Sequence, residues 1–169
     1  MENRKIRVGI THGDINGVGY EVILKTFSDP TMLELCTPVV YGSPKVAAYH
    51  RKAMEIQTSF SIVNSAEEVQ DGRVNVVNCI EEELKVELTK PTPEAGKAAL
   101  AALERALADY REGLFDVLVT APINKHTIQS DAFHFPGHTE YIEERVGEGQ
   151  RALMILLKGD FRVALVTGH

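Results

Sequence analysis

Two short polar segments carry the side chains best suited to chemistry in this sequence. The first holds Asn124 and Lys125, which follow the apolar run 117–119 and a proline, and the second holds His138 and Thr139. In open α/β sheets, ligands bind beyond the carboxyl ends of the strands, where polar residues directly after a strand lie. An ammonium supplies positive charge, while an amide, an imidazole and a hydroxyl supply hydrogen-bond donors. The segments therefore predict a site for a small anionic substrate, with Lys125 as a candidate contact.

Structural roles compete with these functional ones. Thr139 could cap a helix whose first turn contains Glu140; because a helix N-terminus is itself an anion site, the two interpretations are compatible. The glycine-rich stretch 13–19 has neither Walker-loop nor dinucleotide-fingerprint spacing, and a tight turn with positive φ explains its glycines. His12 ends the first expected strand and is more simply a structural residue than a ligand.

Short apolar runs alternate with amphipathic stretches, which predicts an α/β fold. We expect strands near residues 7–10, 39–41, 60–63, 74–77 and 117–119, and helices near 20–27, after Ser43-Pro44 and over 93–112. In the longest helix, Thr92 is the expected N-cap, and an apolar stripe runs from Ala99 through Tyr110 to Leu114. Two apolar runs around Gly159-Asp160 predict an antiparallel hairpin near residues 153–166. The expected fold is a mainly parallel sheet flanked by helices, with that antiparallel pair added.

Composition narrows the class of partner. The 169 residues carry a formal net charge of −6, which argues against nucleic acid as a partner, because its binding relies on lysine and arginine. No apolar run approaches membrane-spanning length. The first residues lead straight into a strand rather than a signal peptide, and two cysteines form neither a disulfide framework nor a zinc cluster. A cytoplasmic protein is the expectation.

Four segments together carry a family resemblance. They are ITHGDINGVG at 10–19, TAPINK at 120–125, FPGHTE at 135–140 and VALVTGH at 163–169. In order and spacing, the chain resembles the 4-hydroxythreonine-4-phosphate dehydrogenase family of vitamin B6 biosynthesis.

The resemblance implies an oxidoreductase reaction. The family oxidises 4-phosphohydroxy-L-threonine with NAD (or NADP), and the resulting β-keto acid loses carbon dioxide to give 3-amino-2-oxopropyl phosphate. It uses a divalent metal, zinc or similar, held by three histidines at an active site shared across a homodimer. Such a metal would polarise the oxygen on which charge develops. Carried over, His138 and Thr139 match the substrate-binding pair and His169 matches the first metal histidine, while no catalytic residue is assigned.

The length departs from the family, whose members are roughly twice as long. We therefore expect residues 1–169 to be the N-terminal portion of a larger two-subdomain α/β dehydrogenase, with the C-terminal half absent and no measurable dehydrogenase activity in this chain alone. Two alternatives stay open. One is a truncated, non-catalytic module that binds a phosphorylated small molecule. The other is a paralogue that oxidises threonate or erythronate 4-phosphate.

Overall fold

The computed structural model describes residues 4–166, and the chain divides into two compact units, 1–134 and 135–169. The first unit contains β1 (Ile6–Thr11), α1 (Gly19–Thr26), α2 (Thr31–Leu35), β2 (Cys36–Gly42), α3 (Pro44–Ala53), β3 (Phe60–Val63), the 3-10 helix η1 (Ala66–Glu68), β4 (Val74–Asn78), α4 (Pro93–Arg111) and β5 (Val117–Thr120). The second contains α5 (His138–Val146), β6 (Met154–Lys158) and β7 (Phe161–Leu165). No helix among the described residues is long and apolar enough to cross a membrane.

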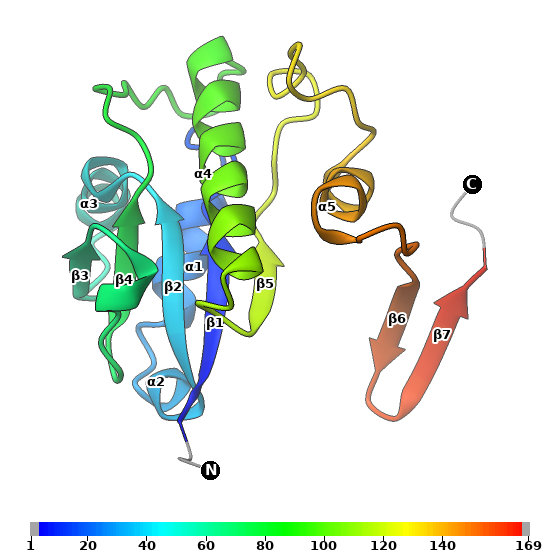
Figure 1. The fold of residues 1–169 in the computed structure, drawn as a ribbon. Coiled ribbons are helices and arrows are strands. Elements are labelled where there is room, and N and C mark those ends of the chain that lie inside the picture. The colour runs from blue at the N-terminus through cyan, green and yellow to red at the C-terminus, as the bar shows by residue number, and fades with distance from the viewer. Residues whose placement is uncertain (1–3, 167–169) are drawn as a thin grey trace. The chain divides into compact units, whose positions relative to one another are not determined.

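A five-stranded sheet in the order β3-β4-β2-β1-β5 forms the centre of the first unit. All its strand pairs are parallel, which confirms the expected α/β fold. Helix α4 lies across one face of the sheet, and α1 and α3 lie on the other (Figure 1). Because every crossover returns the chain to the same end, the carboxyl ends of all five strands meet at one edge.

Helix α4 shows how local sequence sets this packing. The Thr92 hydroxyl caps it by accepting a hydrogen bond from the Ala95 amide at 3.3 Å, and Gly113, with φ of 71°, follows its end. Its small buried residues are Ala95, Ala98, Ala99, Ala102 and Ala106. Short side chains let the helix approach the sheet closely, as predicted. The predicted stripe is wrong at Tyr110, which is 41% exposed because it packs against Phe115 at the helix end instead of against the sheet.

Strand β5 pairs parallel to β1, in keeping with the expected mainly parallel sheet, but it is not fully buried although its sequence is apolar. It forms an edge of the sheet. Leu118 packs towards the α4 side, whereas Val117 and Val119 are 48% and 47% exposed. Alternate residues of a strand point to opposite faces, so this strand is buried on one face only.

The predicted hairpin is present: β6 and β7 pair antiparallel and turn at Gly159, whose φ is 57°. The prediction added this pair to the mainly parallel sheet, but β6 and β7 form a separate two-stranded sheet. A two-residue turn pairs such strands with each other locally, so neither strand needs the edge of the parallel sheet.

A buried polar network joins α4 to the sheet. The Tyr41 hydroxyl donates to Asp109 Oδ2 at 2.9 Å, and Arg105 Nε donates to Asp109 Oδ1 at 3.0 Å. Asp109 is 4% exposed. Burial and the adjacent carboxylate raise the pKa of the Tyr41 phenol, so this phenol stays a donor.

Replacing Asp109 with alanine is expected to lower the free energy of unfolding by about 2–3 kcal/mol, because it leaves the buried Tyr41 hydroxyl without an acceptor. Asp109→Asn keeps one acceptor oxygen and should cost roughly half as much. Urea unfolding of both variants measures the difference. Equal stability of the alanine variant and the parent protein would show that the network contributes nothing.

Candidate functional site

The carboxyl edge of the parallel sheet gathers the loops that could bind a ligand. Strands β1 and β5 are neighbours there, although β2, β3 and β4 come between them in the chain. The chain passes from β1 to one side of the sheet and reaches β5 on the other side. Such a reversal of strand order is where open α/β sheets bind ligands.

The glycine-rich loop after β1 is tied to the loop after β5. The Ala121 amide donates to Thr11 O at 3.1 Å, and the Asp14 amide donates to Pro122 O at 2.9 Å. Gly13 has φ of 71°, and a Cβ there would lie 2.3 Å from Pro122 O. The close approach of two backbones therefore explains this glycine. This confirms the structural interpretation of the glycine-rich stretch that was drawn from the sequence.

Asn16 connects the same loop to the segment that precedes α4. Its amide nitrogen donates to Lys90 O at 2.9 Å and Thr92 Oγ1 at 3.2 Å, and its Oδ1 accepts from the Glu87 amide at 2.8 Å. The side chain is 3% exposed. Asn16 thus fixes residues 87–92 to the glycine-rich loop, a role that sequence reasoning missed, since nothing in the sequence pairs Asn16 with a segment so distant.

Lys125 lies in a turn beyond β5. Its neighbour Asn124 organises that turn, because Asn124 Oδ1 accepts from the amides of His126 at 3.0 Å and Thr127 at 3.2 Å. The Asn124 amide oxygen therefore stabilises the turn. Lys125 itself is exposed, which leaves its ammonium accessible to an anion.

His138 and Thr139 are the first two residues of α5 in the second unit, and both are half-buried. The predicted capping role of Thr139 is wrong: the N-cap is Gly137, and no side chain caps the helix. The helix begins one residue before Thr139, so its hydroxyl lies inside the first turn. His169 lies outside the described residues, and residues 4–166 contain no group of three or more His, Cys, Asp or Glu side chains suited to a metal ion.

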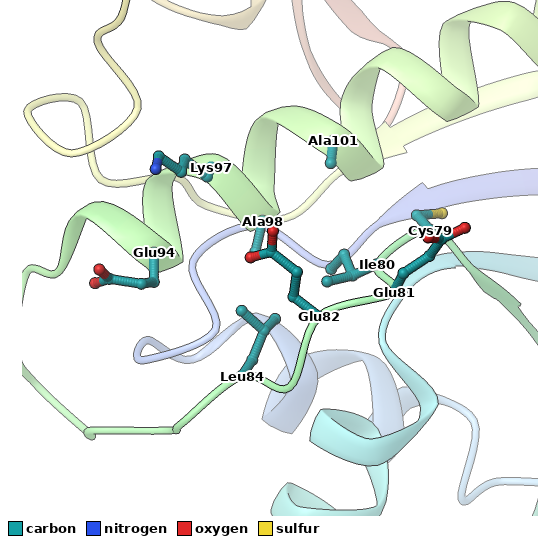
Figure 2. Close-up of a pocket in the computed structure, with 9 residues that line it drawn as sticks. All are labelled: Cys79, Ile80, Glu81, Glu82, Leu84, Glu94, Lys97, Ala98 and Ala101. Carbon is teal, nitrogen blue, oxygen red and sulfur yellow. The ribbon is translucent and has the colours of Figure 1, made fainter.

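A cavity of about 430 Å³ lies between α4 and the segment after β4 (Figure 2). Its lining consists of Cys79, Ile80, Glu81, Glu82, Leu84, Glu94, Lys97, Ala98 and Ala101. Burial raises the pKa of the Cys79 thiol to about 12, so that thiol is protonated at neutral pH and is not a nucleophile. Three carboxylates against one ammonium repel an anionic ligand. The loops beside β1 and β5 suit a phosphorylated substrate better than this cavity does.

Comparison with known proteins identifies the family. The sequence pattern of the family described as pyridoxal phosphate biosynthetic protein PdxA matches residues 34–169. The chain belongs to this family. It is 75% identical over 169 residues to the 4-hydroxythreonine-4-phosphate dehydrogenase of Bacteroides thetaiotaomicron, covering all of this chain and 46% of that protein. It is 31% identical over 165 residues to the D-threonate 4-phosphate dehydrogenase of Cupriavidus necator, covering 96% of this chain and 49% of that protein.

The fold agrees with a solved PdxA-family structure. The crystal structure of a 4-hydroxythreonine-4-phosphate dehydrogenase from Burkholderia phymatum superposes with a TM-score of 0.82 at 27% sequence identity, covering 96% of this chain and 49% of that one. The chain thus spans about half the length of the relatives that it matches. Membership of the PdxA family and the α/β fold predicted from sequence are confirmed.

Proposed function

We propose that this chain is the N-terminal portion of a 4-hydroxythreonine-4-phosphate dehydrogenase of vitamin B6 biosynthesis. The main support for this proposal is that the chain is 75% identical, along its whole length, to a relative of that name. In the proposed reaction, a hydride passes from the carbinol carbon of 4-phosphohydroxy-L-threonine to NAD (or NADP), and the hydroxyl proton is released. The bond between the α-carbon and the carboxylate then breaks and carbon dioxide leaves; its electron pair stays on the α-carbon as an enolate, which takes up a proton to give 3-amino-2-oxopropyl phosphate. The enzyme is proposed to act in the cytoplasm as a homodimer with a shared active site.

We propose that His138, Thr139 and Lys125 contact the substrate. The first turn of α5 supports this assignment, because its amides have no side-chain cap and the N-terminal end of a helix attracts anions. An imidazole and a hydroxyl in that turn add donors for a phosphate or its neighbouring polar groups. Lys125 would add positive charge from the exposed turn after β5.

A divalent metal is proposed to take part, with His169 as its first protein ligand. When bound, it would act as a Lewis acid towards the substrate oxygen. A catalytic zinc site takes three protein ligands, and residues 4–166 do not supply such a group. The remaining ligands are therefore expected from outside the described residues.

The second candidate is a D-threonate 4-phosphate dehydrogenase, since relatives of that name also match along the chain. The identity to that relative is 31%, against 75% for the 4-hydroxythreonine-4-phosphate dehydrogenase, which favours the amino substrate. Expression of the complete gene in a bacterium that lacks its own enzyme for this step should restore growth without pyridoxine. Failure of an expressed, folded protein to restore growth would favour the threonate reaction or the non-catalytic module.

The 169-residue chain by itself is expected to produce no NADH from 4-phosphohydroxy-L-threonine, NAD and zinc. Catalysis with a nicotinamide depends on placing the cofactor against the substrate carbon, and the chain has no dinucleotide fingerprint for this purpose. NADH absorbance measures the result, with the protein from the complete gene as the positive control. Comparable turnover by the two proteins would show that residues 1–169 already contain the catalytic machinery.

A further inference from the structure

Three aromatic rings stack in the interior beneath the carboxyl edge of the sheet. The rings of His12 and Tyr20 have centroids 5.2 Å apart and are nearly parallel, at 9°, and those of Tyr20 and His50 are 5.4 Å apart at 24°. His12 follows β1, Tyr20 lies on α1 and His50 lies on α3. All three side chains are at most 1% exposed. The stack therefore joins three elements that are separate in the sequence.

Each ring also forms hydrogen bonds to backbone groups. His12 Nε2 lies 3.2 Å from Ala98 O on α4, and His50 Nε2 lies 2.8 Å from Ile15 O in the glycine-rich loop. The Tyr20 hydroxyl accepts from the Ser43 amide at 2.9 Å and donates to Ser43 O at 3.1 Å. Through these bonds, the stack fixes loop 12–18 to both α3 and α4.

These bonds determine which ring nitrogen carries the proton when each histidine is neutral. A carbonyl oxygen only accepts, so each Nε2 must carry the proton, and a neutral imidazole then has a bare Nδ1. Both Nδ1 atoms are buried and have no hydrogen-bond partner among the described residues. A second proton would put a positive charge on a buried ring; the backbone of Gly13 favours that charge on His12, but burial outweighs it.

The end of β2 packs closely on two of the rings. A Cβ on Gly42 would lie 2.3 Å from the Tyr20 hydroxyl and 2.5 Å from His12 Cδ2. The backbone of Gly42 is thus packed directly on the first two rings. The stack cannot relax towards this strand end to admit water around a new charge.

The charged and titratable neighbours do not compensate a proton on the stack. Glu21 of α1 favours a charge on His50, but burial has the larger effect and lowers the pKa of His50. Cys79 faces the central phenol as a neutral thiol, and Tyr49 packs edge-on against His50. Burial, reinforced by the other imidazole, lowers the pKa of His12 to about 4.

We propose that the His12–Tyr20–His50 stack is an acid-sensitive latch, which holds loop 12–18 at the carboxyl edge of the sheet and releases it when either imidazole is protonated. Protonation leaves the Nε2 donors in place but puts a charge on a ring whose burial penalises it, and therefore favours the state in which the ring leaves the stack. Asn16 would then carry residues 87–92 with the loop. The latch acts on the geometry of the edge and is independent of the proposed reaction.

The direction of the pH effect follows from the depressed pKa. A histidine that is neutral when buried and protonates normally when released favours the closed loop at and above pH 6.5, and this preference is lost as the pH falls from 6.5 towards 4. Hydrogen exchange in the protein expressed from its complete gene measures the opening. The reporting amides are those of Asp14, Gly17 and Thr89, which are bonded to Pro122 O, Asp14 O and Asn16 O.

Between pH 6.5 and pH 4, the protection factors of these three amides should fall about tenfold or more, while amides of β2 and β4 keep theirs. The matched control is the double variant His12→Gln/His50→Gln, because glutamine donates a hydrogen bond but does not titrate. Its loop amides should keep their protection at both pH values. Unchanged protection in the parent protein, or an equal loss in the double variant, would overturn the latch.

If the double variant fails to fold, a second measurement on the parent protein tests the proposal. Nitrogen NMR of the parent protein should show both imidazoles in the neutral Nε2–H form at about pH 7, and protonation should accompany the loss of loop protection. An imidazole that becomes charged near pH 6.5 while the loop stays protected would also overturn the proposal.

Discussion

Replacing His138 with alanine in the enzyme from the complete gene is expected to lower kcat/KM for 4-phosphohydroxy-L-threonine about thirtyfold or more. His138 opens α5, where its imidazole and the first-turn amides are proposed to bind the phosphorylated substrate. Loss of a hydrogen bond to a charged group costs about 2 kcal/mol, which corresponds to that factor. Steady-state kinetics and a binding titration with the substrate measure it.

His134→Ala is the control for this variant, because His134 is exposed and belongs to the first compact unit. Its kcat/KM should stay within about twofold of the parent value. If His138→Ala binds and turns over substrate as the parent enzyme does, the substrate-binding assignment fails and another residue must supply that contact.

Replacing Gly96 with alanine is expected to destabilise the protein by about 3 kcal/mol, although alanine ordinarily favours a helix by about 1 kcal/mol over glycine. A Cβ on Gly96 would lie 1.8 Å from Thr127 O and 2.3 Å from Thr127 C. The turn that carries Lys125 would have to move away from α4, and Ile128, which is 1% exposed, would lose its packing. Thermal or urea unfolding measures the change.

Gly17→Ala is the matched control, because the nearest atoms to its added Cβ would lie at 3.5 Å, an ordinary contact distance. Its effect should stay within about 0.5 kcal/mol. A Gly96→Ala variant that is more stable than the parent would show that the turn is loosely held and that the helix preference decides the outcome.

Local signals predicted much of the fold. Ser43 caps α3 by accepting from the Val46 amide at 3.4 Å, and Thr92 caps α4 in the same way; both precede a proline at the first helical position. Gly159-Asp160 predicted the hairpin turn. These features are set by residues within a few positions of each other, so a single sequence contains the information.

Features that depend on distant residues were not predictable. The order of the strands makes β5 an edge and exposes Val117 and Val119, and no local pattern encodes that order. The stack of His12, Tyr20 and His50 likewise forms only when β1, α1 and α3 are assembled. The capping error at Thr139 has a different cause, since Gly137 and Thr139 can both cap a helix and the predicted N-cap lies two residues after the observed one.

The proposed reaction is tested most directly by the stoichiometry of the enzyme from the complete gene. With 4-phosphohydroxy-L-threonine, NAD and a divalent metal, we expect equal amounts of NADH and carbon dioxide, and a kcat/KM at least about tenfold above that for D-threonate 4-phosphate. NADH absorbance and release of carboxyl-labelled carbon dioxide measure both products. Absence of NADH with the amino substrate, together with turnover of D-threonate 4-phosphate, would contradict the proposed function.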